Sequence, residues 1–529
     1  MAEKTKDAQR AELHRTIWSI ADDLRGSVDG WDFKQYILGT LFYRFISENL
    51  CEYLNTDEGD GFDYASMSDA EAELGRESIV DEKGYFILPS ELFCNILKTV
   101  DKDGMRIAED GKDLNELLQQ VFKNIEGSAV GADSEDDLKG LFDDMDVNSA
   151  KLGNTVIERN KKLASLITKI GNLDFGGDFK ENRIDAFGDA YEYLMTMYAS
   201  NAGKSGGEFF TPQEVGELLA RITLLGRDEV GKVYDPCCGS AGLLLKFAKI
   251  LGKEKVRKGF YGQEINLTSY NLSRINMFLH DIDFDKFDIA LGDTLVAPAH
   301  LDDAPFDCIV SNPPYSIKWE GKNNPLNIND SRFSSAGVLA PPGKADLAFT
   351  MHMLSCLATD GTAAIVEFPG VLYRGGAERK IRKYLVSNNF VDVVIQLPPD
   401  LFFGTTIATC IIVLKKSKKT SDVLFIDASE QFERHDSKNK LMPANIDKIM
   451  ACIEKRTEEE FFSKLVANDD IVDNDANLSV SSYVEKEDIH EEVDIKALNA
   501  EIARIVAREE ELRQKIDAIV TDLEGDNDE

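Results

Sequence analysis

The chain has 529 residues, of which 43% are hydrophobic and 29% are charged, as in a soluble globular protein. At roughly 150 residues per domain, this length corresponds to about two to four domains. The formal net charge of −35 excludes a chain that is basic as a whole, the usual footprint of a free DNA-binding protein. Either the protein does not bind nucleic acid, or a partner supplies most of the cationic surface.

Several classes of protein are disfavoured by what the sequence lacks. No apolar run reaches the ~18–20 residues that span a bilayer, and no apolar core follows the charged N-terminus, so we expect a cytoplasmic protein without a membrane partner. The eight cysteines are scattered and only Cys237 and Cys238 are adjacent, which indicates reduced, buried thiols. The six histidines show no ligand spacing, so the sequence predicts no metal site.

Residues 1–170 are predicted to form an acidic, helical N-terminal domain. Leu13, Ile17, Ile20 and Leu24 recur at helical spacing, and a helix is expected at residues 114–122. No catalytic motif occurs in this region. A domain that binds a partner or clamps DNA and a purely structural cap both fit the pattern.

Residues 171–420 are predicted to form the catalytic domain, because short β-branched runs alternate with amphipathic helices. This alternation is typical of an α/β fold with a doubly wound, mostly parallel sheet. The seven expected strands are at residues 233–234, 259–262, 289–291, 308–310, 362–366, 391–395 and 409–414. Only residues 397–404 join the last two strands, which predicts that these two pair antiparallel.

Residues 421–488 are predicted to be a mixed connecting segment, and residues 489–529 a long C-terminal helix. The helix carries a heptad seam with Glu509 at one of its positions. The seam residues are Ile495, Leu498, Ile502, Ile505, Leu512, Ile516, Ile519 and Leu523. So narrow a seam needs a helical partner, either the N-terminal helices of the same chain or a helix of another subunit.

A turn with small side chains, residues 235–242, ends the first strand and opens a helix. Asp235, Gly239, Ser240, Ala241 and Gly242 would let the backbone approach a ligand, and the helix N-terminus favours an anionic group. The turn departs from the G-x-G-x-x-G dinucleotide fingerprint. The sequence therefore indicates a cofactor turn, with a tight packing turn as the alternative.

Two acidic residues follow the next two strands. Glu264 ends the second strand, where a carboxylate can accept hydrogen bonds from the ribose of an adenosine-bearing cofactor. Asp293 follows the third strand and is a candidate acceptor for the cofactor's adenine amino group, or else a helix N-cap.

The sharpest signal is the tetrapeptide Asn312, Pro313, Pro314 and Tyr315, which follows the fourth strand. The amino group of a base is a poor nucleophile because its lone pair is delocalised into the ring. The Asn312 side-chain oxygen and the Pro313 carbonyl can accept from its hydrogens, and Tyr315 can stack on the base. A base must leave the duplex to enter such a pocket. This pattern predicts methylation of an exocyclic amino group.

Residues 206–213 precede a helix predicted at residues 214–222. Thr211, Pro212 and Glu214 fit a capping box at its start. The pattern does not explain Phe209 and Phe210, which either line a cofactor pocket or belong to the core.

With these motifs in place, the chain resembles the modification subunit of type I restriction–modification systems, an adenine-N6 DNA methyltransferase with the S-adenosylmethionine-dependent methyltransferase sheet. The resemblance extends from about residue 184 to 414. Its segments are residues 187–194, 207–212, 235–245, 262–266, 292–295, 306–315 and 397–405. Two departures are Tyr315, where many relatives have Phe, and Ala241, where many have Gly.

The resemblance implies S-adenosylmethionine as methyl donor, with contacts from Glu208, Phe209, Phe210, Thr211, Pro212 and Gln213, from the turn and from Glu264. It places catalysis on Asn312 to Tyr315. It also implies double-stranded DNA, a specificity subunit and a restriction motor-nuclease subunit as partners, usually with two modification subunits per specificity subunit. A specificity subunit that reads the DNA would account for the acidic charge and would give the heptad seam a partner.

Three other functions share part of the pattern. A cytosine-N4 DNA methyltransferase uses the same tetrapeptide chemistry. A protein-glutamine methyltransferase faces the same problem at an amide nitrogen, although the large helical domain argues against it. A non-catalytic phage-defence scaffold of the same fold is the third, and the intact Asn312 and Glu264 argue against lost activity.

Overall fold

The structure is a computed structural model of the full chain. It describes residues 13–20, 32–58, 61–100, 113–175, 184–201, 211–402, 405–435, 438–486 and 495–525. The chain divides into two units, residues 1–484 and residues 485–529, and each is described by itself.

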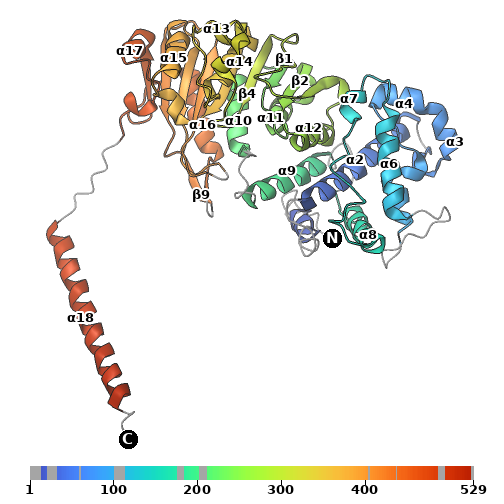
Figure 1. Ribbon diagram of the computed structural model, residues 1–529, viewed down its shortest axis with the longest axis horizontal. Helices are drawn as coiled ribbons and strands as arrows, with labels where there is room; N and C mark the ends of the chain where they lie inside the picture. The colour runs from blue at the N-terminus through green and yellow to red at the C-terminus, as the bar shows by residue number, and fades with distance from the viewer. Residues whose placement is uncertain are drawn as a thin grey trace. The chain divides into compact units, whose positions relative to one another are not determined.

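A nine-stranded sheet forms the centre of the first unit (Figure 1). Its strand order is β11-β8-β6-β7-β5-β4-β1-β2-β3. The strands are β1 (Val230–Asp235), β2 (Val256–Glu264), β3 (Phe287–Leu291), β4 (Phe306–Ser311), β5 (Leu357–Glu367), β6 (Val391–Gln396), β7 (Cys410–Lys415), β8 (Asp422–Asp427) and β11 (Ser463–Ala467). A separate hairpin pairs β9 (Glu433–His435) with β10 (Lys438–Lys440).

The sheet is doubly wound and mostly parallel, as predicted. Strands β3, β2, β1, β4 and β5 run parallel, whereas β7 pairs antiparallel with both β5 and β6. The predicted antiparallel pairing of the last two expected strands is therefore confirmed. The predicted number of seven strands is too small, because β8 joins β6 and β11 joins β8 at the edge of the sheet.

Two hydrophobic cores lie on opposite faces of this sheet, because successive side chains of a strand point to opposite sides. Val233 of β1 belongs to one core and the following Tyr234 to the other; Val310 and Ile309 of β4 divide in the same way. Both faces are therefore apolar, as expected for strands covered on both sides.

Helices cover the sheet on both faces. The first face carries α10 (Gln213–Thr223), α11 (Gly242–Leu251), α12 (Leu267–Leu279) and α16 (Pro443–Lys455). The second carries α13 (Ser331–Ser334), α14 (Asp346–Cys356), α15 (Ala377–Ser387) and α17 (Asn468–Asp473). The helix predicted at residues 214–222 is α10.

The helices of the N-terminal region share the core of the first face. They are α2 (Asp32–Glu58), α3 (Asp69–Ala72), α4 (Arg76–Lys83), α5 (Phe93–Lys98), α6 (Leu114–Ser128), α7 (Glu135–Leu138), α8 (Val156–Gly171) and α9 (Ile184–Asn201). The helix predicted at residues 114–122 is the start of α6. Figure 1 shows α2 and α9 beside α12.

Arg274 of α12 is the most connected residue at this junction. Its guanidinium donates to the backbone carbonyls of Asp136 (2.8 Å), Asp137 (3.2 Å) and Lys139 (3.0 Å). A further bond of 2.6 Å reaches the Asn271 side chain, and Arg274 is almost completely buried. One side chain thus satisfies several carbonyls of the segment around α7.

The second unit contains α18 (Ile495–Gly525), a helix of 31 residues over the predicted heptad seam. Six seam side chains are between 49% and 60% exposed: Leu498, Ile502, Ile505, Leu512, Ile516 and Ile519. Within the second unit, the helix therefore carries an exposed apolar stripe along the described part of the seam.

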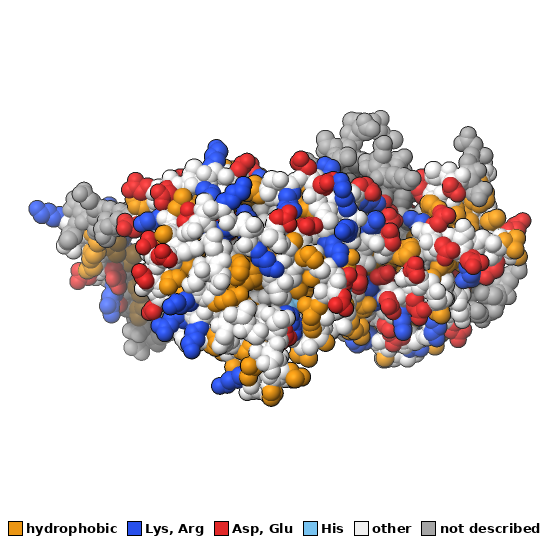
Figure 2. All heavy atoms as spheres, turned by 90° about the horizontal axis from the view of Figure 1, so that it is seen from above, with side chains coloured by type: hydrophobic (Ala, Val, Ile, Leu, Met, Phe, Trp, Pro, Cys, Tyr) orange, Lys and Arg blue, Asp and Glu red, His pale blue; other side chains and the backbone are white. Residues whose placement is uncertain are grey.

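The surface mixes both signs of charge. On the face drawn in Figure 2, acidic and basic side chains are interspersed around smaller hydrophobic areas. None of the helices in the described ranges combines the length and apolar character that crossing a membrane requires.

Replacing Arg274 by Met should lower the free energy of unfolding by about 2 kcal/mol or more, because three partly buried backbone carbonyls would lose their donor. Thermal unfolding of the two proteins would measure this effect. Arg257→Met is the matched control, since Arg257 is exposed on β2. Equal melting temperatures for Arg274→Met and the control would contradict the role of Arg274 at the junction.

Candidate functional site

The site lies where the strand order reverses. From β1 the chain continues to β2 and β3 on one side, and it later returns to β4 and β5 on the other side. The carboxyl ends of the neighbours β1 and β4 therefore meet, which is where open α/β sheets bind ligands. The segment after β1 is the predicted cofactor turn, and the segment after β4 is the predicted catalytic tetrapeptide.

The cofactor turn has the backbone that its small residues allow. Gly239 (φ +54°) and Ala241 (φ +62°) adopt left-handed conformations, and Ala241 is the N-cap of α11. The left-handed conformation costs an alanine roughly 1 kcal/mol, whereas a glycine would adopt it without strain. The turn also approaches β2 closely: a Cβ on Gly262 would lie 2.9 Å from the Cys238 sulfur.

Asp235 joins the two strand ends. Its Oδ1 accepts from the Cys237 backbone N–H (3.0 Å) and from the Ser311 hydroxyl (2.9 Å), the residue just before Asn312. Its buried Oδ2 has no hydrogen-bond partner among the described residues. Burial raises the pKa of Asp235 to about 7, despite the two bonds to Oδ1, which lower it.

Asn312 is held at both ends of its amide group. Its Nδ2 donates to the Thr211 hydroxyl (3.0 Å), and its Oδ1 accepts from the Tyr315 hydroxyl (2.7 Å). Burial raises the pKa of Tyr315 well above its usual value, so this hydroxyl stays protonated. The oxygen predicted to face an amino group is thus oriented by a donor of its own tetrapeptide.

The predicted capping box at Thr211 is wrong. Helix α10 begins at Gln213 with Pro212 as N-cap, and no side chain caps it. Thr211 bonds Asn312 instead, 101 positions along the chain. The sequence pattern assigned the Thr211 hydroxyl to the helix start, but in the structure it accepts from the first residue of the tetrapeptide.

One pocket brings many of the predicted residues together. Its lining is Thr211, Pro212, Gln213, Gly216, Asp235, Cys237, Cys238, Gly239, Ser240, Gly242, Leu243, Lys246 and Asn312. Lys246, which sequence reasoning missed, lies one turn after Gly242 on α11, so helical periodicity from the turn is the signal that points to it. The side-chain oxygen of Gln213 is buried and has no partner among the described residues.

Other predicted residues support the turn in this structure. The Glu264 oxygens accept from the backbone N–H groups of Gly239 (2.9 Å) and Asn266 (2.8 Å). Asp293 accepts from the Leu295 N–H (2.9 Å), as a cap does. Their cofactor contacts remain predictions, and both groups retain acceptor capacity.

The remaining predicted residues are placed as follows. Pro313 is buried and Pro314 is half-buried. Ala241, within the cofactor turn, is buried. Glu208, Phe209 and Phe210 lie outside the described residues.

Two further residues missed by sequence reasoning fix the loops. Asn276 donates to the Ser240 carbonyl (2.7 Å). Arg332, in the loop after the tetrapeptide, donates to the carbonyls of Thr294 (2.8 Å) and Leu295 (2.9 Å). Both contacts join segments more than 30 residues apart, so no local sequence pattern predicts them.

Comparison with known proteins identifies the class of this site. A model of the N-6 DNA Methylase family matches residues 182–492, and a model of the HsdM N-terminal domain matches residues 13–170. The chain is 48% identical to the type I restriction enzyme MpnII methylase subunit of Mycoplasma pneumoniae over 99% of each protein. It is 28% identical to the MjaVII methylase subunit of Methanocaldococcus jannaschii, over 98% of this chain and 85% of that protein.

The solved structures agree. The crystal structure of a type I restriction-modification methyltransferase subunit from Streptococcus thermophilus superposes with a TM-score of 0.80 at 34% identity, covering 90% of this chain and all of that chain. Fold and sequence together define an N6 DNA methyltransferase. The chain belongs to the family of type I restriction enzyme methylase subunits.

Asp235→Asn should flatten the pH dependence of stability. The raised folded-state pKa means that the neutral carboxyl favours the folded state at low pH, and this contribution is lost as pH rises toward about 7. The wild-type melting temperature should therefore fall more than that of Asp235→Asn between about pH 5.5 and pH 8. The exposed Asp302→Asn is the control for lost charge. Parallel pH profiles for wild type and Asp235→Asn would refute the proton on Asp235.

Proposed function

We propose that the protein transfers a methyl group from S-adenosylmethionine to the N6 amino group of an adenine flipped out of double-stranded DNA. It does so as the modification subunit of a type I restriction–modification complex, whose methylation protects host DNA from restriction. The observation that carries this proposal is the position of Asn312: its amide lies at the end of β4, in one pocket with the turn after β1.

The pocket has features that suit S-adenosylmethionine. A Cβ on Gly239 or Gly242 would meet nothing within 4 Å, so a ligand has open access to the turn. Asp235 and Gln213 line this pocket, and each has a buried, unpartnered side-chain oxygen. The Gln213 oxygen can accept from a ligand ammonium, and the Asp235 oxygen can do so once that carboxyl has lost its proton. Glu264 is the proposed acceptor for ribose hydroxyls and Asp293 for the adenine amino group. The bound cofactor supplies an electrophilic methyl group.

The chain's own groups would activate the target base. Asn312 Oδ1 has a second lone pair besides the one engaged by Tyr315, and it accepts from one N6 hydrogen of the adenine. The Pro313 carbonyl accepts from the other. These acceptors favour a tetrahedral amino nitrogen and stabilise the positive charge that develops on it. The Tyr315 ring is the proposed stacking surface for the base.

Adenine is favoured over cytosine as the target. The match to the N-6 DNA Methylase family supports this choice, since the tetrapeptide alone is compatible with both amino groups. The same match argues against a protein amide as substrate, and the intact hydrogen-bonded Asn312 argues against an inactive scaffold.

Asn312→Ala should abolish methylation, because the base would lose its main acceptor. Cofactor binding should be largely retained, since Asn312 is one of many residues that line the pocket. Transfer of a tritiated methyl group to DNA measures the first effect, and calorimetry with S-adenosylmethionine measures the second. Full methylation by the variant would refute the role of Asn312 as an acceptor for the amino group of the base.

Tyr315→Phe separates the roles of ring and hydroxyl. Its activity should fall by less than about tenfold, since one neutral hydrogen bond contributes roughly 1 kcal/mol and the ring remains. Tyr315→Ala should lose more, because stacking is worth about 1–3 kcal/mol. Equal losses in the two variants would count against the stacking role.

We also propose that DNA selection depends on partner chains. A specificity subunit would read the DNA, with two copies of this chain per specificity subunit, and a restriction subunit would join for cleavage. The net charge of −35 supports this division, because the chain by itself repels the phosphate backbone. The exposed seam of α18 is the proposed docking surface for helices of the specificity subunit.

Charge placed in the seam should therefore prevent assembly. We expect Ile502→Glu/Ile516→Glu to fold but to lose co-purification with the specificity subunit. The matched control is Ala507→Glu/Gln514→Glu, which adds the same two charges away from the seam. Truncation after Asp488 should behave like the seam variant. Complex formation that is unchanged in the seam variant would refute the docking role of α18.

A further inference from the structure

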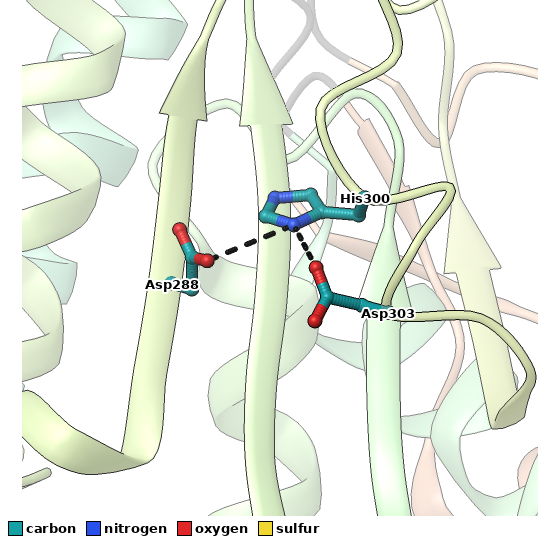
Figure 3. Close-up of side chains that lie close together, drawn as sticks. All are labelled: Asp288, His300 and Asp303. Atoms are coloured by element: carbon teal, nitrogen blue, oxygen red, sulfur yellow. Dashed lines mark hydrogen bonds and ion pairs between the residues drawn. The ribbon is translucent and has the colours of Figure 1, made fainter.

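Three side chains outside the methyl-transfer pocket converge on one point (Figure 3). Asp288 lies on β3, and His300 and Asp303 lie in the segment between β3 and β4. The His300 Nδ1 is 3.2 Å from an Asp303 oxygen and 3.9 Å from an Asp288 oxygen. Because the three residues are 12 and 3 positions apart, their sequence spacing did not indicate a metal site.

The other ring nitrogen of His300, Nε2, is engaged in a hydrogen bond with the backbone. Nε2 lies 2.8 Å from the Gly262 carbonyl oxygen, which can only accept, so Nε2 carries the hydrogen. The ring is 3% exposed, and the edges of Tyr234 and Tyr261 pack around it. The remaining ring nitrogen, Nδ1, faces both carboxylates. The Nδ1 atom and one oxygen of each carboxylate lie within 4.8 Å of one another, so a single cation could contact all three.

We propose that Asp288, His300 and Asp303 bind a divalent first-row transition metal ion such as Zn²⁺ or Mn²⁺. One imidazole and two carboxylates suit these ions, and Mg²⁺ and Ca²⁺ prefer oxygen ligands alone. An Nε2–H bonded to a backbone carbonyl is the usual support of a metal-bound histidine.

The separations between the ligand atoms fit such an ion. Ligands bound at about 2.1 Å and separated by the observed 3.2 and 3.9 Å subtend angles of roughly 100° and 135°, which lie on either side of the tetrahedral angle of about 109°. The Asp288 side chain is 60% exposed, so water has access to a fourth position.

Lys232 offsets only part of the negative charge of the Asp288 and Asp303 carboxylates. Its ammonium donates to the Asp303 backbone carbonyl and lies 4.0 Å from Asp303 Oδ1, the carboxylate oxygen that does not face His300. One ammonium offsets one of the two carboxylates, so one negative charge remains to attract a cation.

The ion would act as a clamp. It would tie β3 to the segment that carries His300, whose Nε2 already holds β2 at Gly262, two residues before Glu264. The same segment is anchored by Gln263, which bonds Ala297 and Ala299. Metal binding should therefore stabilise the side of the fold that presents Glu264 and Asp293, without contact with Asn312.

The full chain, freed of metal by a chelator, would be titrated with Mn²⁺ and separately with Zn²⁺. Mn²⁺ avoids competition from the eight cysteines, since carboxylate and imidazole suit it better than thiolate. Equilibrium dialysis with elemental analysis should find one ion per chain, with a raised melting temperature. Asp288→Asn should weaken binding at least tenfold, as should Asp303→Asn if the first variant folds poorly. The exposed Asp302→Asn should bind like wild type.

Two results would overturn the proposal. One is the absence of stoichiometric uptake of either ion. The other is uptake that Asp288→Asn and Asp303→Asn leave unchanged while circular dichroism shows them folded. In either case the three side chains would form a hydrogen-bonded cluster that holds no metal.

Discussion

The hydrogen bond from Ser311 to Asp235 is the contact on which the site depends. It joins the last residue of β4 to the last residue of β1, and so it fixes Asn312 relative to the cofactor turn. This contact exists only because the chain places β2 and β3 on one side of β1 and β4 on the other. A sheet wound in one direction would separate the two motifs by at least one strand.

Contacts from neighbouring segments explain why the turn tolerates strained and buried groups. Asp235 is fully buried with one oxygen unpartnered, and Ala241 adopts a conformation that favours glycine. Groups of this kind cost stability wherever they occur. They persist here because Glu264 and Asn276 hold the turn from neighbouring segments. These contacts within the chain hold the turn, which reduces the ordering that ligand binding must supply.

Local patterns in the sequence predicted the elements well and the contacts between them poorly. Apolar runs predicted all strands from β1 to β7, because both faces of the sheet are buried. They missed β8 and β11, which lie in the segment assigned as mixed and connecting. β8 has a buried apolar run at residues 423–426 and lies between β6 and β11, whereas β11 is a five-residue strand at the edge of the sheet. The Thr211 capping box failed because a hydroxyl has several possible partners, and the tetrapeptide supplied a distant one. The Tyr315 ring was predicted from its position, but its bond to Asn312 required coordinates.

The acidic charge and the α18 seam have a common explanation. Like charges scattered over a surface keep a chain soluble, but they also oppose approach to DNA. A helix of 31 residues with an exposed apolar stripe gains little from its own hydrogen bonds and much from a partner that covers the stripe. A cationic partner docked on this seam would bury the apolar side chains, and its positive charge would offset the repulsion between this chain and DNA. The catalytic pocket then needs only to accept a base that another surface has selected.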